Sequence, residues 1–208
     1  MPVVPLFETK ADLVLGPEII QAFLKHPVTR SSQPYWDRSI DNTIGDTWLK
    51  EPIRPRLKRA PIQQVMLGYS DSNKDCGIIA SLWAVRRAQI HLAEIGRQLG
   101  VDIQFFHGRG GTISRGAGPT HRFLDALPGG TMAGGLRITE QGETIGQKYS
   151  NVLTASHNLE LLLAGTLACK ARPTEAIASR GWSRILDTLS NRSSEVYQSL
   201  IQSPRFDE

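Results

Sequence analysis

The chain has 208 residues, of which 40% are hydrophobic and 21% are charged, and this composition excludes a disordered chain and allows one sizeable core. Its formal net charge is +4 and its pI is near 9.3, but the basic residues are spread along the chain, so we expect a solvated surface and no nucleic-acid partner. Cys76 and Cys169 lie far apart without metal-ligand spacing, which argues against a disulfide framework or a zinc site and favours a reducing cytoplasm.

The first element in the chain is a short apolar, β-branched run from Val3 to Phe7 that ends at Glu8. This pattern predicts a buried strand with a polar residue at its carboxyl end. A helix is expected next, with Pro17 at its first position and a stop at Pro27, because proline suits the start of a helix and cannot continue one.

Residues 29–61 have a different character from the rest of the chain. The segment contains four prolines and shows no sustained periodicity, which predicts a long surface excursion. Its basic stretch RPRLKR, residues 54–59, could contact nucleic acid, but a solvated basic loop is the favoured interpretation.

A second strand is predicted over Val65–Tyr69, followed by a dense polar cluster at residues 70–75. Cys76–Leu99 reads as a long amphipathic helix, and a third strand over Asp102–Phe106 runs into His107. The apolar positions of the helix that recur at helical spacing are Ile79, Leu82, Trp83, Ile90 and Ile95.

A fourth strand over Leu136–Thr139 runs into Glu140, and two long helices are predicted after it, over Val152–Lys170 and Trp182–Ile201. The longest apolar stretch, around Leu159–Cys169, is too short to cross a bilayer, and the N-terminus lacks the features of a signal peptide. We therefore expect a soluble, cytoplasmic protein with no membrane partner.

Each predicted strand delivers an ionisable residue near its carboxyl end: Glu8, Asp71, His107 and Glu140. Strands separated by helices favour parallel pairing, and polar residues at the carboxyl ends are typical of the active face of a (β/α)8 barrel or an open α/β sheet. A complete barrel needs about 250 residues. The predicted fold class is therefore α/β, part of a (β/α)8 TIM-type barrel with extensive helix, in which residues 1–150 form a partial barrel and residues 151–208 a helical segment.

The third strand leads into a glycine-rich loop, FFHGRGGTISRGAG at Phe105–Gly118. Glycines permit close approach of the backbone to a ligand, and Arg109 and Arg115 are permanent cations that bind phosphate or carboxylate in a bidentate manner. The loop matches neither common nucleotide-binding motif. An anion site is favoured over a purely structural glycine turn, because two arginines are more than a turn needs.

The remaining candidates each have a structural alternative. Glu8 and Asp71 are hard oxygen donors that could share Mg²⁺ or Mn²⁺, or could instead be helix caps or ion-pair partners. His107 could act as a general acid or base, or as a hydrogen-bonding brace behind the loop. Lys74 could neutralise an anion, pair with Asp71 or Asp75, or simply be a surface lysine.

Four sequence blocks together resemble the phosphoenolpyruvate carboxylase family. VMLGYSDSNKDCG at Val65–Gly77 resembles the family's lysine-containing signature, and FHGRGGTISRGAGPTH at Phe106–His121 resembles its phosphate-binding loop. PLFET at Pro5–Thr9 and GGLRITEQGETI at Gly134–Ile145 are similar to two further blocks. The four blocks occur in the family's order.

The resemblance implies a role for each candidate residue. Glu8 and Asp71 would hold a divalent metal ion, Mg²⁺ or Mn²⁺, and Arg109 would bind the substrate phosphate. In the family-like loop, the substrate-binding residues are Arg109, Gly110 and Gly111, and the catalytic residues are His107, Arg115 and Lys74. The implied substrates are phosphoenolpyruvate and bicarbonate, and the implied products are oxaloacetate and phosphate.

The chain also departs from the family pattern. Ser114 and Ala117 stand where the family usually has glycine, which restricts positive φ angles in the loop. The family's enzymes are several times longer, and their catalytic histidine and one phosphate arginine lie in blocks that this sequence lacks. We therefore expect a carboxylase segment that is incomplete alone and either self-associates or binds the missing part. The alternative is a non-catalytic remnant or partner subunit that binds an acidic metabolite or the rest of a split enzyme.

Overall fold

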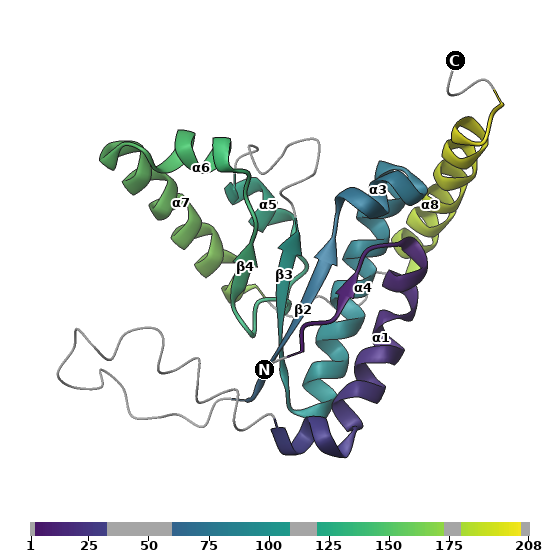
Figure 1. Cartoon of the computed structure of the whole chain (residues 1–208), viewed down its shortest axis with the longest axis horizontal. Coiled ribbons are helices and arrows are strands. Elements are labelled where there is room, and N and C mark those ends of the chain that lie inside the picture. The colour runs from purple at the N-terminus through teal and green to yellow at the C-terminus, as the bar shows by residue number, and fades with distance from the viewer. Residues whose placement is uncertain (1–2, 33–59, 109–119, 173–179, 205–208) are drawn as a thin grey trace.

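The computed structural model describes residues 3–32, 60–108, 120–172 and 180–204. Within these ranges, strands and helices alternate along the first three quarters of the chain, and the last two long elements are helices (Figure 1). The elements are β1 (Leu6–Phe7), α1 (Lys10–Lys25), β2 (Ile62–Gly68), α3 (Ser70–Cys76), α4 (Ile78–Leu99), β3 (Asp102–Gly108), α5 (Thr120–Ala126), β4 (Leu136–Ile138), α6 (Gly142–Tyr149), α7 (Val152–Ala171) and α8 (Arg180–Ile201). Residues 27–32 are also helical.

The four strands form one parallel sheet in the order β1-β2-β3-β4. Phe7 is level with Leu67, Leu67 with His107, and His107 with Ile138, so the carboxyl ends of all four strands reach the same edge. The predicted α/β class and the four parallel strands, as part of a (β/α)8 barrel, are confirmed. The bounds differ from the predicted ones: β1 covers only Leu6–Phe7 of the predicted buried strand Val3–Phe7, and Leu6 is 43% exposed. β2 begins at Ile62, and β3 extends to Gly108.

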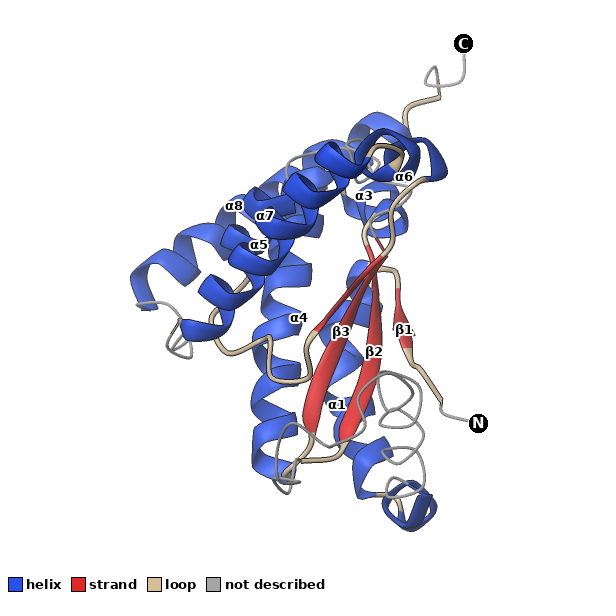
Figure 2. Cartoon of the chain, turned by 90° about the vertical axis from the view of Figure 1, so that its left-hand side faces the viewer, coloured by secondary structure: helices blue, strands red, loops and turns tan. Residues whose placement is uncertain are grey.

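One face of the sheet packs on α1 and α4 and forms the main core (Figure 2). Side chains at alternate positions of β2 and β3 point into this core. Its most buried members from the strands and helices are Val65, Leu67, Ile103, Phe105, Leu13, Ile20 and Leu92.

The face that α4 turns to the sheet differs from the one its large apolar residues predicted. Ile79 and Leu82 are about half exposed, at 45% and 51%, whereas Ala80, Ala84 and Ala88 are buried. Small side chains let a helix approach a sheet closely, and α4 adds Val85 and Leu92 to these alanines on its buried face. Trp83, Ile90 and Ile95 are intermediate in exposure.

α1 begins before Pro17, which lies inside the helix and not at its first position as predicted. The helix starts after a capping box, in which Thr9 Oγ1 accepts a hydrogen bond from Asp12 N and Asp12 Oδ2 accepts one from Thr9 N. This cap fixes the start of the helix at Lys10. The predicted stop is close to the observed end, since α1 ends at Lys25 with His26 as its C-cap.

α7 and α8 lie at opposite flanks of the molecule, α7 on the side of β4 and α8 on the side of α1 (Figure 1). α7 packs on α5 and α6 around a second small core of Leu124, Leu127, Met132 and Cys169. α8 packs back on α4 and α3, where Asp187 accepts hydrogen bonds from Trp83 Nε1 and Arg87 Nη1 at 2.8 and 2.6 Å. The two predicted helices are thus present, and each packs on a different pair of helices.

α7 is also long and apolar enough to cross a membrane, judged by length and composition alone. One such helix is weak evidence of a membrane segment, because a helix that packs on a further polypeptide can have the same composition. Its exposed apolar side chains are Val152, Leu153, Leu159, Leu163 and Leu167. α8 carries a comparable exposed stripe of Trp182, Ile185, Leu189, Val196 and Leu200.

The second face of the sheet is lined by partly exposed side chains. Gln64 Oε1 accepts a hydrogen bond from Arg137 Nη1 at 2.7 Å, and Gln64 Nε2 donates to Gln104 Oε1 at 2.5 Å. The Arg137 guanidinium also lies 4.3 Å from the centre of the Phe106 ring. In a (β/α)8 barrel this face is the barrel interior, which is normally filled by side chains from the other strands.

Candidate functional site at the carboxyl edge of the sheet

Glu8 reaches the end of β2 because residue 68 is a glycine. Phe7 pairs with Leu67, so Glu8 is level with Gly68. A Cβ atom at Gly68 would lie 2.9 Å from Cγ and 3.1 Å from Cα of Glu8, closer than packed carbon atoms allow. The missing side chain therefore leaves the space in which the Glu8 side chain sits beside the end of β2.

Asp71 and Lys74 lie on α3, the short helix that follows β2 almost without a loop. The turn from β2 into α3 is held by Ser72 Oγ, which donates a hydrogen bond to Gly68 O at 2.9 Å or to Tyr69 O at 3.1 Å. Lys74 Nζ lies 3.3 Å from Asp71 Oδ1, and both side chains are more than half exposed. An exposed pair of this kind contributes about 0–1 kcal/mol, so a ligand can displace it easily.

The carboxylates of Glu8 and Asp71 suit a hard divalent cation. Among the described residues there is no group of three or more histidine, cysteine, aspartate or glutamate side chains placed to hold a metal ion. Mg²⁺, however, is commonly bound through one or two carboxylates, with water and substrate oxygens in its other positions. The Gly68 gap places Glu8 beside the end of the strand that leads directly to Asp71, and both residues are carboxylates of the kind that such a site uses.

His107 is 2% exposed, and its ring lies on the helix side of the sheet. Its Nδ1 atom is 2.9 Å from the hydroxyl oxygen of Tyr69, and the edge of the Phe123 ring packs against it at a centroid distance of 5.0 Å. Gln89 Nε2 donates to the Tyr69 hydroxyl at 3.4 Å. These contacts are those of a buried brace, whereas the catalytic role predicted for His107 stays a prediction.

Residues 109–119 of the glycine-rich loop lie outside the described residues. They include Arg109, Gly110, Gly111 and Arg115. The two described neighbours of this segment are fixed in the fold. Gly108 ends β3, where an added Cβ would lie 3.0 Å from Leu67 O, and Thr120 begins α5.

Sequence reasoning missed Lys148, which forms a buried ion pair with Glu140. The side chains of Lys148 and Glu140 are 12% and 8% exposed, and Lys148 Nζ also donates to Thr120 Oγ1 at 3.1 Å. The pair joins α6 to the segment after β4 and to the first residue of α5. The sequence offers a partial signal, because Glu140 follows its predicted strand, but Lys148 lies eight residues further on and no local pattern links the two.

A parallel sheet with covering helices and polar side chains at its carboxyl edge defines part of a (β/α)8 barrel, the fold in which active sites form at that edge. The model of the family "Phosphoenolpyruvate carboxylase" matches residues 1–208. The chain belongs to the phosphoenolpyruvate carboxylase family.

Curated relatives agree with this assignment. Phosphoenolpyruvate carboxylase of Methylorubrum extorquens is 40% identical over 210 residues, covering 97% of this chain and 20% of the relative. The enzyme of Xanthomonas oryzae pv. oryzae is 41% identical over 206 residues, covering 98% and 20%. That of Parasynechococcus marenigrum is 36% identical over 199 residues, covering 96% and 18%. The chain thus spans about one fifth of the length of these relatives.

Proposed function

We propose that the chain carries the metal- and phosphate-binding part of a phosphoenolpyruvate carboxylase, a cytoplasmic carboxy-lyase that converts phosphoenolpyruvate and bicarbonate to oxaloacetate and phosphate. The observation that carries this proposal is the approach of Glu8 to Gly68, which brings one carboxylate to the strand that leads into Asp71. In a chain of this family, two such carboxylates beside the segment that begins at His107 are a site for a cation and an anionic substrate.

The described residues support separate roles for the two carboxylates, for Lys74 and for His107. Glu8 and Asp71 would hold Mg²⁺ or Mn²⁺, which when bound supplies positive charge beside the enolate oxygen of the substrate. Lys74 leaves its weak pair with Asp71 and contacts an anionic oxygen. His107 orients the start of the glycine-rich loop through its hydrogen bond to Tyr69, and this positioning role agrees better with 2% exposure than direct contact with substrate does.

The residues of the loop complete the proposed chemistry. Arg109, with Gly110 and Gly111, binds the phosphate, and Arg115 positions phosphate and bicarbonate. A bicarbonate oxygen attacks phosphorus and the bond to the enol oxygen breaks, which gives carboxyphosphate and the enolate of pyruvate. The enolate carbon then takes the carboxyl group as the carbon–oxygen bond of carboxyphosphate breaks and phosphate leaves. The two arginines stabilise the negative charge in both steps.

We infer that further polypeptide completes this site. The four strands found among the described residues cannot close a barrel of eight, and the sheet face of Gln64, Gln104 and Arg137 corresponds to a barrel interior. The exposed apolar stripes of α7 and α8 offer a further surface for the rest of the family's chain or for self-association.

Metal titration tests the site. The isolated chain should bind Mn²⁺ weakly, as measured by water-proton relaxation or calorimetry, and Asp71→Asn or Glu8→Gln should lose most of this binding because each removes one of two charged ligands. Glu160→Gln, at an exposed position of α7, is the control for a lost surface charge. Equal Mn²⁺ affinity of Asp71→Asn and the parent would contradict the metal assignment.

Turnover tests the rest of the proposal. In an assay coupled to malate dehydrogenase, the chain alone should form no useful amount of oxaloacetate, because the open side of the site leaves the reacting charges in contact with water. Robust turnover that Asp71→Asn abolishes would show that the missing strands are not needed.

In a reconstituted enzyme, Arg109→Ala should weaken phosphoenolpyruvate binding by about 2–3 kcal/mol, and Arg115→Ala should mainly reduce turnover.

A further inference from the structure

Asp75 links the two segments that carry Glu8 and Asp71. Its Oδ2 atom accepts a hydrogen bond of 2.8 Å from the backbone N–H of Lys10, across 65 positions of sequence. Lys10 is the first residue of α1 and lies two residues after Glu8. Asp75 lies four residues after Asp71 on α3, so the two carboxylates are on the same side of this helix.

The backbone on the Glu8 side of this link is rigid. β1 pairs with β2 up to Phe7, and the capping box of Thr9 and Asp12 fixes the next residues. The backbone hydrogen bond from Thr9, with a further one from its side chain, lowers the pKa of the Asp12 carboxyl. The N–H of Lys10 is one of the first N–H groups of α1, which have no partner within the helix, and its acceptor comes from α3.

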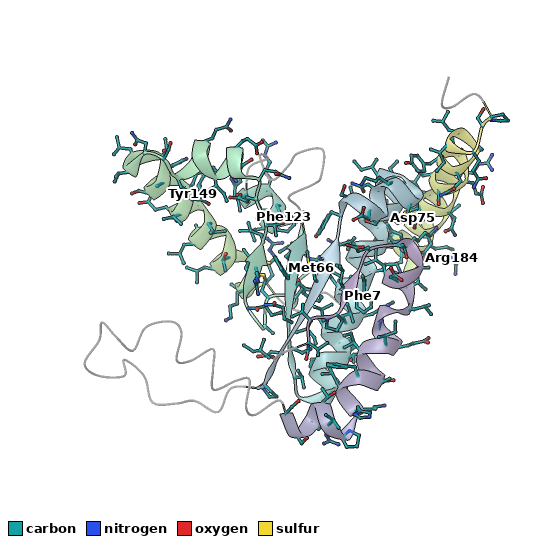
Figure 3. All side chains as sticks on the ribbon, viewed as in Figure 1. Phe7, Met66, Asp75, Phe123, Tyr149 and Arg184 are labelled. Carbon is teal, nitrogen blue, oxygen red and sulfur yellow. The ribbon has the colours of Figure 1, made fainter. Side chains whose placement is uncertain are left out.

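The α3 side of the link is also held by two hydrogen bonds from α8. The Tyr197 hydroxyl donates to Lys74 O at 3.0 Å, and Gln198 Nε2 donates to Asp75 O. Gly77 ends α3 with φ of +79°, and an added Cβ there would lie 3.0 Å from Cγ of Tyr197. Figure 3 labels Asp75 on α3, where this helix lies close to α1 and α8.

We propose that Asp75 is a positioning residue that fixes the separation of Glu8 and Asp71 for a divalent cation, and this inference rests on the metal site of the proposed function. A two-carboxylate site binds a cation most tightly when the carboxylates do not have to be brought together on binding. The hydrogen bond from Lys10 N to Asp75 connects the segment of Glu8 to α3, one turn away from Asp71. This connection holds the two carboxylates of the site in place before the cation binds. Negative charge at the N-terminus of α1 adds to the strength of the contact.

Mn²⁺ affinity of the isolated chain tests the proposal. Asp75→Ala should weaken Mn²⁺ binding about tenfold, as substitutions beside metal ligands typically do, while Glu8 and Asp71 remain in place. Asp75→Asn keeps an oxygen acceptor for Lys10 N–H and should restore most of the affinity. The matched control is Asn151→Ala, which removes a hydrogen bond of the same length, 2.8 Å, at the N-terminus of α7, far from the site in sequence. It should lower the melting temperature without changing Mn²⁺ affinity.

Hydrogen exchange of the metal-free chain supplies a second readout. The Lys10 amide should exchange faster in Asp75→Ala than in the parent, and Asp75→Asn should restore its protection. The positioning role is refuted if Asp75→Ala binds Mn²⁺ like the parent, or if Asn151→Ala loses as much affinity. These outcomes are separate from failure of the metal site, which would appear as unchanged Mn²⁺ binding in both Glu8→Gln and Asp71→Asn.

Discussion

The hydroxyl oxygen of Tyr69 lies 2.9 Å from Nδ1 of His107, and both side chains are buried. Tyr69 directly follows β2 and leads into the helix that carries Asp71, whereas His107 belongs to the end of β3 and precedes the glycine-rich loop. The contact therefore joins the two strand ends from which the metal-binding and phosphate-binding segments are proposed to start. Gln89 and Phe123, which contact this pair, belong to the helices α4 and α5.

Tyr69→Phe should reduce the free energy of unfolding by about 1–3 kcal/mol, because it removes the hydroxyl while the buried Nδ1 atom of His107 stays in place. Urea unfolding measures the change. Tyr197→Phe is the control, since it deletes an exposed hydroxyl that donates to Lys74 O, and a smaller loss is expected. Equal losses of unfolding free energy in the two variants would mean that the buried contact stabilises the chain no more than the exposed one.

Gly68→Ala should destabilise the chain by about 1–3 kcal/mol, because its Cβ would lie 2.9 Å from Glu8 Cγ and 3.1 Å from Glu8 Cα, and β1 would have to move. The Mn²⁺ affinity of the Gly68→Ala variant should also be lower than that of the parent. Gly146→Ala in α6 is the matched control, since nothing lies within 4 Å of an added Cβ there, and alanine is favoured over glycine inside a helix by about 1 kcal/mol. Thermal unfolding compares the two, and a neutral Gly68→Ala would contradict the close approach of Glu8.

The strand content and the parallel order were predictable because each strand is a short apolar run bounded by polar or glycine residues, and helices separate the runs. The position of Glu8 and Asp71 at one edge followed from the same rule. The buried side of His107 was also readable. It shares the parity of Ile103 and Phe105 in β3, so it had to face the helices with them.

Other features depend on contacts that no local pattern contains. The buried face of α4 contains Ala84 and Ala88 together with Val85 and Leu92, whereas Ile79 and Leu82 are about half exposed. The return of α8 to α4 rests on Asp187, which meets Trp83 and Arg87 across about half the chain. Such pairs follow from the assembled fold and not from helical spacing.

His91 on α4 should make stability depend on pH. Burial, and second the positive charge of Arg87, lower the pKa of His91 from its ordinary value of 6.5. The unfolded chain therefore binds the proton more readily, and the folded chain should lose stability as pH falls through about 6.5 towards the lower folded-state pKa. Urea unfolding of the parent and of His91→Gln at pH 8 and pH 5.5 measures this. The parent should lose more stability than the variant between these pH values, and parallel losses would exclude His91 as the cause.

The ion pair of Lys148 and Glu140 provides the last prediction, because its two side chains are 12% and 8% exposed and Lys148 also reaches Thr120. Removal of one partner leaves a buried charge without its counter-ion, so Lys148→Ala and Glu140→Ala should each cost about 3–5 kcal/mol. The double variant leaves no such charge and should cost clearly less than the sum. Arg192→Ala is the control, since Arg192 and Glu195 form an exposed pair at 3.1 Å and its loss should cost less than about 1 kcal/mol. Urea unfolding of the four variants measures these losses: additive losses for Lys148→Ala and Glu140→Ala would show that the two charges do not stabilise each other.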